Sequence, residues 1–387
     1  MATIKSIILV VNADWYFWSH RLALAQALRN TGIEVVVAAA IERNYDHTIR
    51  QAGFRFIPLK LQRRSVNFLT EMRSLLELRH IYHEEQPDIV HHFTIKPVIY
   101  GSLAARAARI PFIVNTIPGL GYTFLANTQK RRVIRRAVLI AYRAALMSKN
   151  LRVIFENPDD QSLFVQKNVI PSYRTKVIRS SGVDTNLFHP VPEPHGPPIV
   201  LLASRLLWDK GIQEFVDAAR LVKESGLICR FVLIGIPDIK NPNSVPEESL
   251  RQWHDAGLVE WWGFHNDMPK VLQQSTIVTL PSYYPEGVPR ILLEAAATGR
   301  TIVTTDTPGC REVVQHNVTG LLVPPRQSSP LAEAILIALK DPQLRERLGS
   351  AARTRVEQEF EESYVIAQTI AVYRNLTGDQ AFPLLAN

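Results

Sequence analysis

Short apolar segments alternate with stretches of helical character along nearly the whole chain. In the first half the apolar segments occupy residues 6–11, 33–40, 87–93, 111–117, 151–157 and 176–180. Apolar runs of about four to eight residues, separated by helical segments, are typical of parallel strands that are covered on both faces. This pattern predicts a doubly wound α/β sheet, in which ligands bind beyond the carboxyl ends of the strands.

A proline-rich segment at residues 189–198 interrupts this alternation. Because prolines oppose regular strand pairing and stiffen the chain, we predict that these residues link two domains. The apolar segments then resume at 198–204, 229–235, 258–264, 275–282, 300–306 and 319–325. We therefore expect two Rossmann-like domains that face each other across a ligand-binding cleft, one of residues 1–188 and one of residues 199–361.

Charge is unevenly distributed between the two halves. The 387 residues include 44 lysines and arginines against 36 acidic residues, yet the net charge is +13 through Pro190 and −5 from Val191 onward. A hydrophobic content of 46% excludes a disordered chain. The two cysteines, Cys229 and Cys310, exclude a disulfide scaffold and favour a reduced, cytoplasmic interior. No segment approaches the roughly 18 uncharged apolar residues of a membrane span, so only peripheral membrane contact stays open.

Two glutamates, Glu286 and Glu294, flank the start of a helix that we predict near Pro289. Glu286 would lie in the preceding loop, and Glu294 about a turn and a half into the helix, since proline suits a first helical turn. Free backbone amides at a helix start suit an anion, and carboxylates suit sugar hydroxyls. From the spacing alone, a capped surface helix with two solvated glutamates is an equally good interpretation.

Two cations follow the first apolar segment of the second half. Arg205 comes just after this segment, and Lys210 precedes a helix that begins near Gly211. Such a pair is a candidate clamp for a diphosphate. The alternative is a pair of loop cations neutralised by Asp209 and Glu214.

The pair of cations and the pair of glutamates, within two Rossmann-like halves, resembles the retaining glycosyltransferases of the GT-B fold, family 4. The resemblance covers essentially the whole chain. It implies that Arg205 and Lys210 hold the donor's diphosphate and stabilise the departing nucleotide. It also implies that Glu286 contacts the transferred sugar and that Glu294 binds the nucleotide ribose.

The same resemblance implies further donor contacts and a returning C-terminal helix at residues 362–380. Fixed cations act where negative charge develops on the leaving nucleotide. We therefore expect no metal and no cofactor beyond the nucleotide-sugar donor, which by resemblance is a uridine-diphosphate hexose or N-acetylhexosamine. The implied donor-binding residues are Gly287, Val288 and Pro289, with Gly263, Phe264 and His265 near the base.

The N-terminal half departs from the best-known pattern of the family. Many members carry a histidine after the strand at 111–117, whereas this chain has a Gly-Leu-Gly-aromatic loop with Gly119 and Gly121. That loop is similar to the subgroup that extends saccharides on polyprenyl-diphosphate carriers. Its glycines would let the backbone approach a ligand, although a plain strand-to-helix turn is an equal alternative. Weaker candidates for acceptor binding are His20, Arg21 and Lys96.

No acidic residue occurs between Ile89 and Phe155, and this window contains a basic segment with helical patterning. Three arginines fall on one side of the predicted helix, while Ile134, Val138, Ala141 and Ala145 form a separate apolar side. Such a helix can lie on an anionic membrane, although a solvated helix face is the alternative. The candidate membrane-binding residues are Lys130, Arg131, Arg132, Arg135, Arg136 and Arg143.

The sequence thus predicts a retaining glycosyltransferase that extends a lipid-diphosphate-linked saccharide at the inner face of the cell membrane. A transferase with a soluble or lipopolysaccharide acceptor is the first alternative, and a nucleotide-sugar epimerase is more distant. A non-catalytic sugar-nucleotide-binding protein is disfavoured, because both motifs are intact. Nucleic-acid binding fits a pI near 9.5, but no compact nucleic-acid module is visible, so no nucleic acid is expected as a partner.

Overall fold

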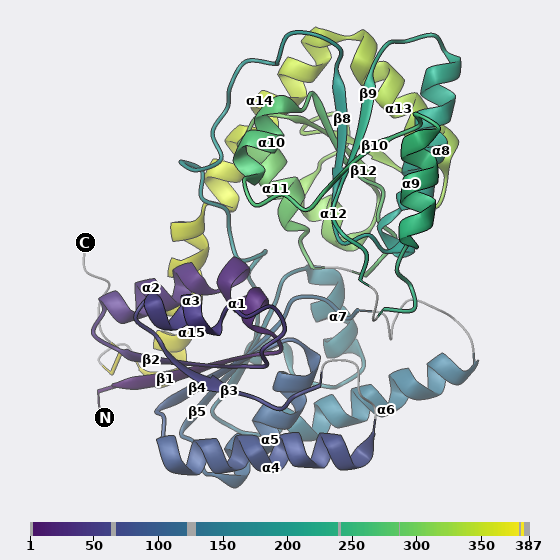
Figure 1. Cartoon of the computed structure of the whole chain (residues 1–387). Helices are drawn as coiled ribbons and strands as arrows, with labels where there is room; N and C mark the ends of the chain where they lie inside the picture. The colour runs from purple at the N-terminus through teal and green to yellow at the C-terminus, as the bar shows by residue number, and fades with distance from the viewer. Residues whose placement is uncertain are drawn as a thin grey trace. The chain divides into compact units, whose positions relative to one another are not determined.

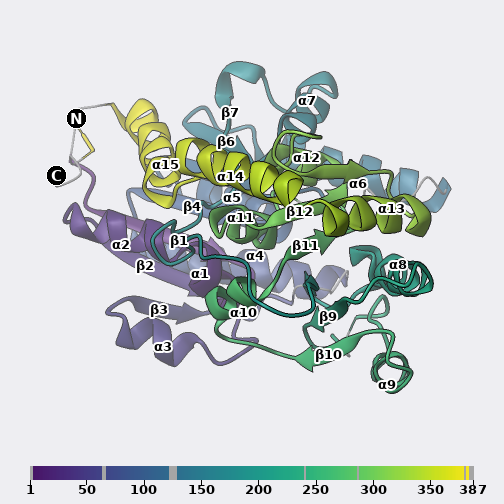
Figure 2. The same cartoon turned by 90° about the horizontal axis from the view of Figure 1, so that it is seen from above.

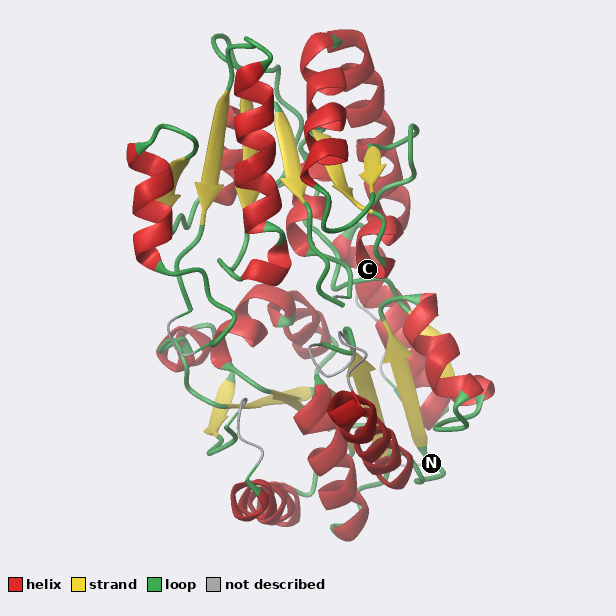
Figure 3. Ribbon diagram, turned by 90° about the vertical axis from the view of Figure 1, so that its right-hand side faces the viewer, coloured by secondary structure: helices red, strands yellow, loops and turns green. Residues whose placement is uncertain are grey.

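A computed structural model describes residues 3–62, 67–121, 129–238, 241–285, 287–378 and 381–382. The chain divides into two compact units (Figure 1). The first unit comprises Met1–Ser181 and Ser363–Asn387, and the second comprises Gly182–Glu362. Each unit contains one parallel sheet with helices on both faces, as the alternating pattern predicts (Figure 3).

The first unit contains a seven-stranded sheet in the order β3-β2-β1-β4-β5-β6-β7. Each predicted apolar segment of this half holds one strand, but β3 was not predicted, because it is a four-residue edge strand that ends in a proline. The strands are β1 (Ser6–Val11), β2 (Glu34–Ala39), β3 (Arg55–Pro58), β4 (Ile89–Phe93), β5 (Phe112–Ile117), β6 (Leu151–Phe155) and β7 (Thr175–Val177).

Two hydrophobic clusters cover the two faces of this sheet. One face packs against α1 (Asp14–His20), α2 (Leu22–Asn30), α3 (Asp46–Gln51) and α15 (Glu362–Thr377). The other packs against α4 (Phe68–Glu85), the π-helical turn η1 (Pro97–Gly101), α5 (Ser102–Ala107), α6 (Gln129–Ala145) and α7 (Pro158–Gln166). The final helix is tied to the sheet by a 2.6 Å hydrogen bond between the Tyr373 hydroxyl and His91 Nδ1.

The second unit contains a six-stranded sheet in the order β10-β9-β8-β11-β12-β13 (Figure 2). The strands are β8 (Ile199–Ala203), β9 (Arg230–Ile234), β10 (Glu260–Gly263), β11 (Ile277–Leu280), β12 (Thr301–Thr305) and β13 (Leu321–Val323). One face packs against α10 (Met268–Gln274), α11 (Arg290–Ala297), α12 (Pro308–Val313) and α14 (Pro342–Glu359). The other packs against α8 (Ile212–Glu224), α9 (Glu247–Asp255) and α13 (Ser328–Lys340).

The boundary between the units lies between Ser181 and Gly182, whereas the sequence placed the end of the first domain at residue 188. The proline-rich segment 189–198, predicted as a linker, belongs to the second unit. Arg345 donates from Nε and an η nitrogen to the Glu193 carboxylate at 2.9 and 2.8 Å, and Arg300 donates to the Pro192 carbonyl at 3.4 Å. The prolines therefore stiffen a segment that packs on its own domain.

Candidate active site

The strands β8 and β11 are neighbours at the position where the second sheet changes direction. They pair in parallel register, with Ile277 opposite Val200. The chain runs from β8 through β9 to β10 at one edge, and from β11 through β12 to β13 at the other. Such a reversal leaves a crevice beyond the carboxyl ends of the strands, where open α/β sheets bind ligands. The two sequence motifs follow these two strands.

The loop after β8 is bonded to the loop after β11. The carbonyl of Asp209 accepts hydrogen bonds from the Tyr283 amide at 3.0 Å and from the Ser282 hydroxyl at 3.3 Å. Gly211 has φ of +79°, and a β-carbon at this residue would lie 2.2 Å from the carbonyl oxygen of Pro281. Only glycine satisfies both conditions. The structure thus joins two motifs that are far apart in the sequence.

The two candidate cations of this site differ in their surroundings. Lys210 ends the short 3-10 helix η4 (Trp208–Lys210) and is only 6% exposed. Its Nζ lies 5.3 Å from the ring centroid of Tyr284, a contact that no sequence pattern predicts. Arg205 is half-buried, and its guanidinium forms no hydrogen bond or ion pair within the described ranges. A guanidinium without a protein partner is well suited to a bidentate contact with a phosphate.

The alternative in which Glu214 neutralises Arg205 does not agree with the structure. The Oε2 atom of Glu214 is buried and has no hydrogen-bond partner among the residues that the structure describes. Burial raises the pKa of this carboxyl, and the charge of Arg326 opposes the shift. Glu214 therefore does not neutralise the charge of Arg205.

Glu294 lies in the second turn of α11, for which Pro289 is the N-cap rather than the first residue. The residue is only 9% exposed, and its carboxylate accepts a 2.8 Å hydrogen bond from Arg290 Nε. Burial raises the pKa of Glu294, and the Arg290 charge opposes that shift. Glu294 is thus not the solvated surface glutamate of the alternative interpretation. The role of Arg290 was missed, although its i, i+4 spacing to Glu294 is a detectable signal.

The remaining residues of this motif surround the start of α11. Glu286 lies outside the described residues. Gly287 is half-buried and Val288 is 8% exposed, packing in the core of the second unit. The first amides of a helix have no intrahelical acceptor, so the backbone at the start of α11 offers donors that suit an anion.

The loop after β10 lies beside the loop after β9. The Gly235 amide donates to the Gly263 carbonyl at 2.8 Å, and Gly263 has φ of +74°. Phe264 is 54% exposed. His265 packs near Trp262, with ring centroids 5.8 Å apart, and its buried Nδ1 has no hydrogen-bond partner in the described part of the chain. An exposed aromatic ring and an unsatisfied ring nitrogen are the features that a planar base could use.

In the first unit, the acceptor candidates follow β1, β4 and β5 at the carboxyl edge of the sheet. His20 ends α1, stacks on Tyr16 with centroids 4.6 Å apart and has Nδ1 2.6 Å from the Ser19 hydroxyl. Lys96 donates to the Glu71 carboxylate at 2.6 Å and to the Gln62 carbonyl at 2.6 Å. Gly119 and Gly121 follow β5, and Gly121 has φ of +64°.

Arg21 is a buried residue of this unit. It is 6% exposed and donates to the Glu156 carboxylate and to the Tyr16 hydroxyl, both at 2.9 Å. Its guanidinium also lies 4.5 Å from the centroid of the Phe93 ring. These contacts are those of an internal ion pair, so Arg21 holds Glu156 and α1 in place.

His91, His92 and the acids after β6 have structural surroundings. Both histidines are fully buried, and each is hydrogen-bonded on both ring nitrogens, so they are core residues. Asp159 and Asp160 lie in the first turn of α7, where Asn157 is the N-cap. Negative charges at a helix start are favoured by the helix dipole.

The predicted apolar side of the basic helix α6 faces its own domain. Ala145 is buried and Val138 and Ala141 are half-buried against the core of the first unit, whereas Ile134 is 43% exposed. A second apolar stripe, spaced four and three residues apart, lies beside Arg132, Arg136 and Arg143 and is exposed except at the half-buried Ala144. Nothing is described of the Lys130 and Arg131 side chains. The members of this stripe are Val133, Ala137, Ile140, Ala144 and Met147.

Within the described residues, no group of three or more His, Cys, Asp or Glu side chains could hold a metal ion. No helix in the described part of the chain is long and apolar enough to cross a bilayer.

Two family models match the chain, one in each structural unit. A glycosyl transferase 4-like model matches residues 6–157, and the model of glycosyl transferases group 1 matches residues 183–355. The chain is a glycosyltransferase with a glycosyl transferase 4-like domain followed by a group 1 domain. The group 1 match contains both motifs of the crevice, as the resemblance implied.

Individual relatives agree with this assignment. The chain is 27% identical to the N,N'-diacetylbacillosaminyl-diphospho-undecaprenol alpha-1,3-N-acetylgalactosaminyltransferase of Campylobacter jejuni, over 92% of this chain and 95% of that protein. It is 25% identical to the Escherichia coli UDP-Gal:alpha-D-GlcNAc-diphosphoundecaprenol alpha-1,3-galactosyltransferase, over 67% and 68% of the two chains. Anabaena HepE, solved in complex with UDP, matches with a TM-score of 0.75 and 21% identity over 96% and 100% of the chains. The glycosyltransferase therefore has the GT-B fold.

Proposed function

We propose that this glycosyltransferase transfers a hexose or N-acetylhexosamine from a UDP-sugar to a lipid-diphosphate-linked saccharide, with retention of configuration. The observation that carries the donor half is the junction of two loops at the switch point of the second sheet, where Asp209 accepts from Tyr283 and Ser282. Two relatives whose names include diphospho-undecaprenol or diphosphoundecaprenol support the acceptor class. The UDP complex of a structural neighbour supports the nucleotide.

In this proposal the donor's diphosphate binds at Arg205 and Lys210. Cleavage of the bond between sugar and phosphate moves negative charge onto the nucleoside diphosphate, and cations fixed beforehand stabilise that charge without reorganisation. Glu294 accepts hydrogen bonds from the ribose hydroxyls, with Arg290 favouring its charged form. Glu286 contacts the transferred sugar, and His265 contributes its unsatisfied Nδ1 near the base.

The reaction needs neither a metal nor a protein nucleophile in this account. The acceptor hydroxyl attacks the anomeric carbon on the face from which the nucleotide leaves, so the bond to the acceptor forms as the bond to phosphate breaks. The proton of that hydroxyl passes to the departing phosphate oxygen. A chelator should therefore leave turnover intact; turnover that a chelator abolishes and that added divalent metal restores would exclude this part of the proposal.

The acceptor is proposed to bind at the carboxyl edge of the first sheet. Gly119 and Gly121 allow a close approach of the backbone, and His20 and Lys96 follow neighbouring strands. The exposed stripe and arginines of α6 suit an anionic membrane surface at the inner face of the cell membrane. A lipid-linked acceptor would require such a surface, because the enzyme must reach a substrate that is held in the bilayer.

The test is a transfer assay with a panel of nucleotide sugars and lipid-diphosphate-linked saccharides, with products identified by mass spectrometry. Product should form from a UDP-sugar and a lipid-linked acceptor, with the anomeric configuration of the donor retained when the bond is assigned by NMR. Glu286→Ala should abolish most transfer. Transfer only to soluble saccharides, or an unchanged rate in Glu286→Ala, would contradict the proposal.

A further inference from the structure

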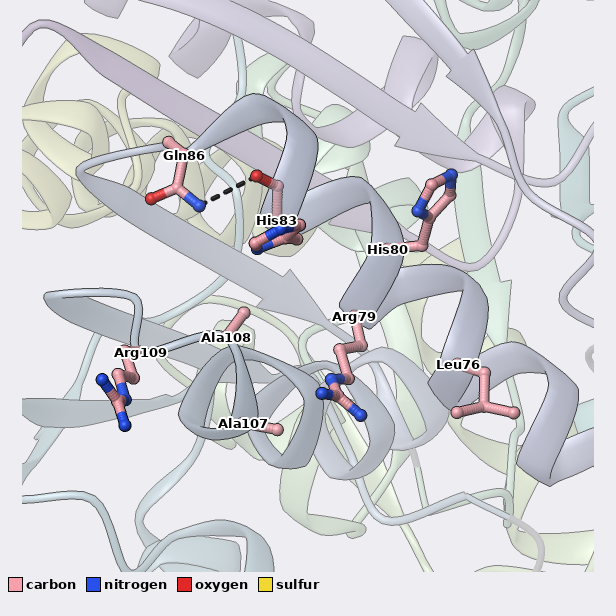
Figure 4. Close-up of a pocket in the computed structure, with 8 residues that line it drawn as sticks. All are labelled: Leu76, Arg79, His80, His83, Gln86, Ala107, Ala108 and Arg109. Carbon is pink, nitrogen blue, oxygen red and sulfur yellow. Dashed lines mark hydrogen bonds between the residues drawn. The ribbon is translucent and has the colours of Figure 1, made fainter.

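An open groove of about 700 Å³ lies between α4 and α5 in the first unit (Figure 4). It is formed where these helices end, at Glu85 and Ala107, just before β4 and β5 begin. The groove therefore lies at the edge of the sheet where the strands start. The acceptor candidates Lys96, Gly119 and Gly121 follow the ends of the same strands, so this groove is a separate site.

Positive and titratable side chains line the groove. Arg79 and Arg109 lie on either side of a floor made by Ala107 and Ala108 (Figure 4). Neither guanidinium forms a hydrogen bond or an ion pair within the part of the chain that the structure describes. His83 adds ring nitrogens, while His80 Nε2 lies 3.2 Å from the Glu84 carboxylate. No carboxylate is among the described lining residues.

Two of the polar lining side chains belong to residues whose backbone is in the left-handed conformation. Gln86 caps α4 with φ of +45°, and Arg109 follows α5 with φ of +58°. Glycine is the residue that such left-handed positions favour, because it has no β-carbon. Both helix ends instead carry long polar side chains, and both of these line the groove.

An exposed apolar stripe leads along α4 to the groove. Phe68, Leu69, Met72 and Leu76 are 73%, 66%, 38% and 53% exposed. Met72, Leu76, Arg79 and His83 follow one another at helical spacing, so one face of α4 changes from apolar to cationic. Leu76 belongs to both the stripe and the groove. The helices α4, α5 and α6 lie side by side on one face of the sheet (Figure 1).

We propose that this groove binds the phosphate of an anionic membrane lipid while the apolar stripe of α4 enters the bilayer. Two arginines whose guanidinium groups have no partner among the described residues suit a phosphate diester, and the floor of alanines leaves room for it. The neighbouring stripe provides an apolar surface for the acyl chains, which a free phosphate in solution would not need. This inference rests on the proposed function only in taking a membrane as the place of work.

The test measures partition of the full-length protein onto phosphatidylcholine vesicles with and without phosphatidylglycerol, at fixed ionic strength. No sugar donor or acceptor is present, so the result is independent of whether transfer occurs. The protein should prefer the anionic vesicles. In Arg79→Gln/Arg109→Gln this partition should fall about 30-fold, the effect of losing two cations at a membrane surface. The control Arg220→Gln/Arg251→Gln removes two exposed charges of the second unit and should change partition little.

Two further measurements keep the inference falsifiable. Ala107→Glu places a carboxylate on the exposed floor and should weaken binding to anionic vesicles without changing the circular dichroism spectrum. Equal losses in the groove variant and the control variant would overturn the proposal. It would also fail if inorganic phosphate shifted the ring NMR signals of His80 and His83 while anionic vesicles did not, since the site would then take a free phosphate.

Discussion

Arg290 and Glu294 form a hydrogen-bonded ion pair one turn apart in α11, with Nε and Oε1 separated by 2.8 Å. The Glu294 side chain is 11% exposed and the Arg290 side chain 27%. Burial raises the pKa of the carboxyl, and the guanidinium holds that increase in check. Arg290 thus favours the charged form of Glu294 near the crevice at which we propose that the donor binds.

Arg290→Gln should lower the free energy of unfolding by about 2 kcal/mol at neutral pH, because it leaves a buried carboxylate without its partner. The loss should shrink in acid, where Glu294 takes up a proton and needs no cation. Urea unfolding at both pH values measures this. The control Arg251→Gln breaks an exposed pair with Glu247 of the same spacing and should cost about 0.5 kcal/mol or less. Equal costs for the two variants would contradict the account.

Gly211→Ala should destabilise the second unit and weaken donor binding, because the new β-carbon would lie 2.2 Å from the Pro281 carbonyl oxygen. A cost of about 3 kcal/mol is expected from backbone strain and the clash together. Gly226 has nearly the same φ, +81°, but no atom within 4 Å of its β-carbon position. Gly226→Ala should therefore cost only about 1 kcal/mol, from the backbone alone. The difference in thermal unfolding between the two variants measures the effect of disturbing the contact between the loop at Gly211 and the loop at Pro281.

Asp160→Asn should change how stability depends on pH. Burial raises the pKa of Asp160 to about 6, helped by Asp159 and opposed by the hydrogen bond from Asn157. The folded protein therefore holds this proton more tightly than the unfolded chain. The resulting stability is complete below about pH 4 and is lost as the pH rises to about 6.

The variant lacks this titration, so it should match the parent protein below about pH 4 and exceed its stability by about 3 kcal/mol above pH 6. The measurement is the difference in unfolding free energy between the two proteins across this range. A less stable Asp160→Asn at neutral pH would mean that attraction to the start of α7 outweighs burial.

Ile140→Glu should reduce partition onto anionic vesicles by about tenfold or more, because it places a charge in the exposed stripe of α6. Ile140 is 68% exposed, so the midpoint of thermal unfolding should not fall. Ile337→Glu makes the same change at a residue of α13 that is 54% exposed, and should leave vesicle partition as it was. Equal partition of the two variants would exclude α6 as a membrane contact.

The strands and their parallel arrangement were predictable, because continuous short apolar segments are typical of parallel strands that are buried on both faces. Short helices were harder to see. The helical pattern after β1 begins only at His20, but the chain forms α1 up to His20 and starts α2 at Leu22, on either side of the buried Arg21. The sequence also does not indicate which side of α6 is buried, since it contains two apolar stripes and only packing decides between them.

The residues of the candidate site could be predicted only from their residue types and their spacing in the sequence. Arg205, Lys210 and Glu294 were found because their motif is specific. The bond from Tyr283 to Asp209 and the fit of Gly211 against Pro281 join segments distant in sequence, which periodicity does not relate. The groove between α4 and α5 depends likewise on two helix ends meeting, so no local pattern indicates it.

The most direct test of the central claim is calorimetric titration with UDP of the full-length protein, of Arg205→Gln and of the exposed control Arg251→Gln. The account places the diphosphate on Arg205, whose guanidinium has no partner within the described ranges. Loss of one charge-assisted contact should weaken UDP binding about tenfold or more in Arg205→Gln. The control should bind as tightly as the parent protein. Equal affinity in Arg205→Gln and the parent protein would contradict the account.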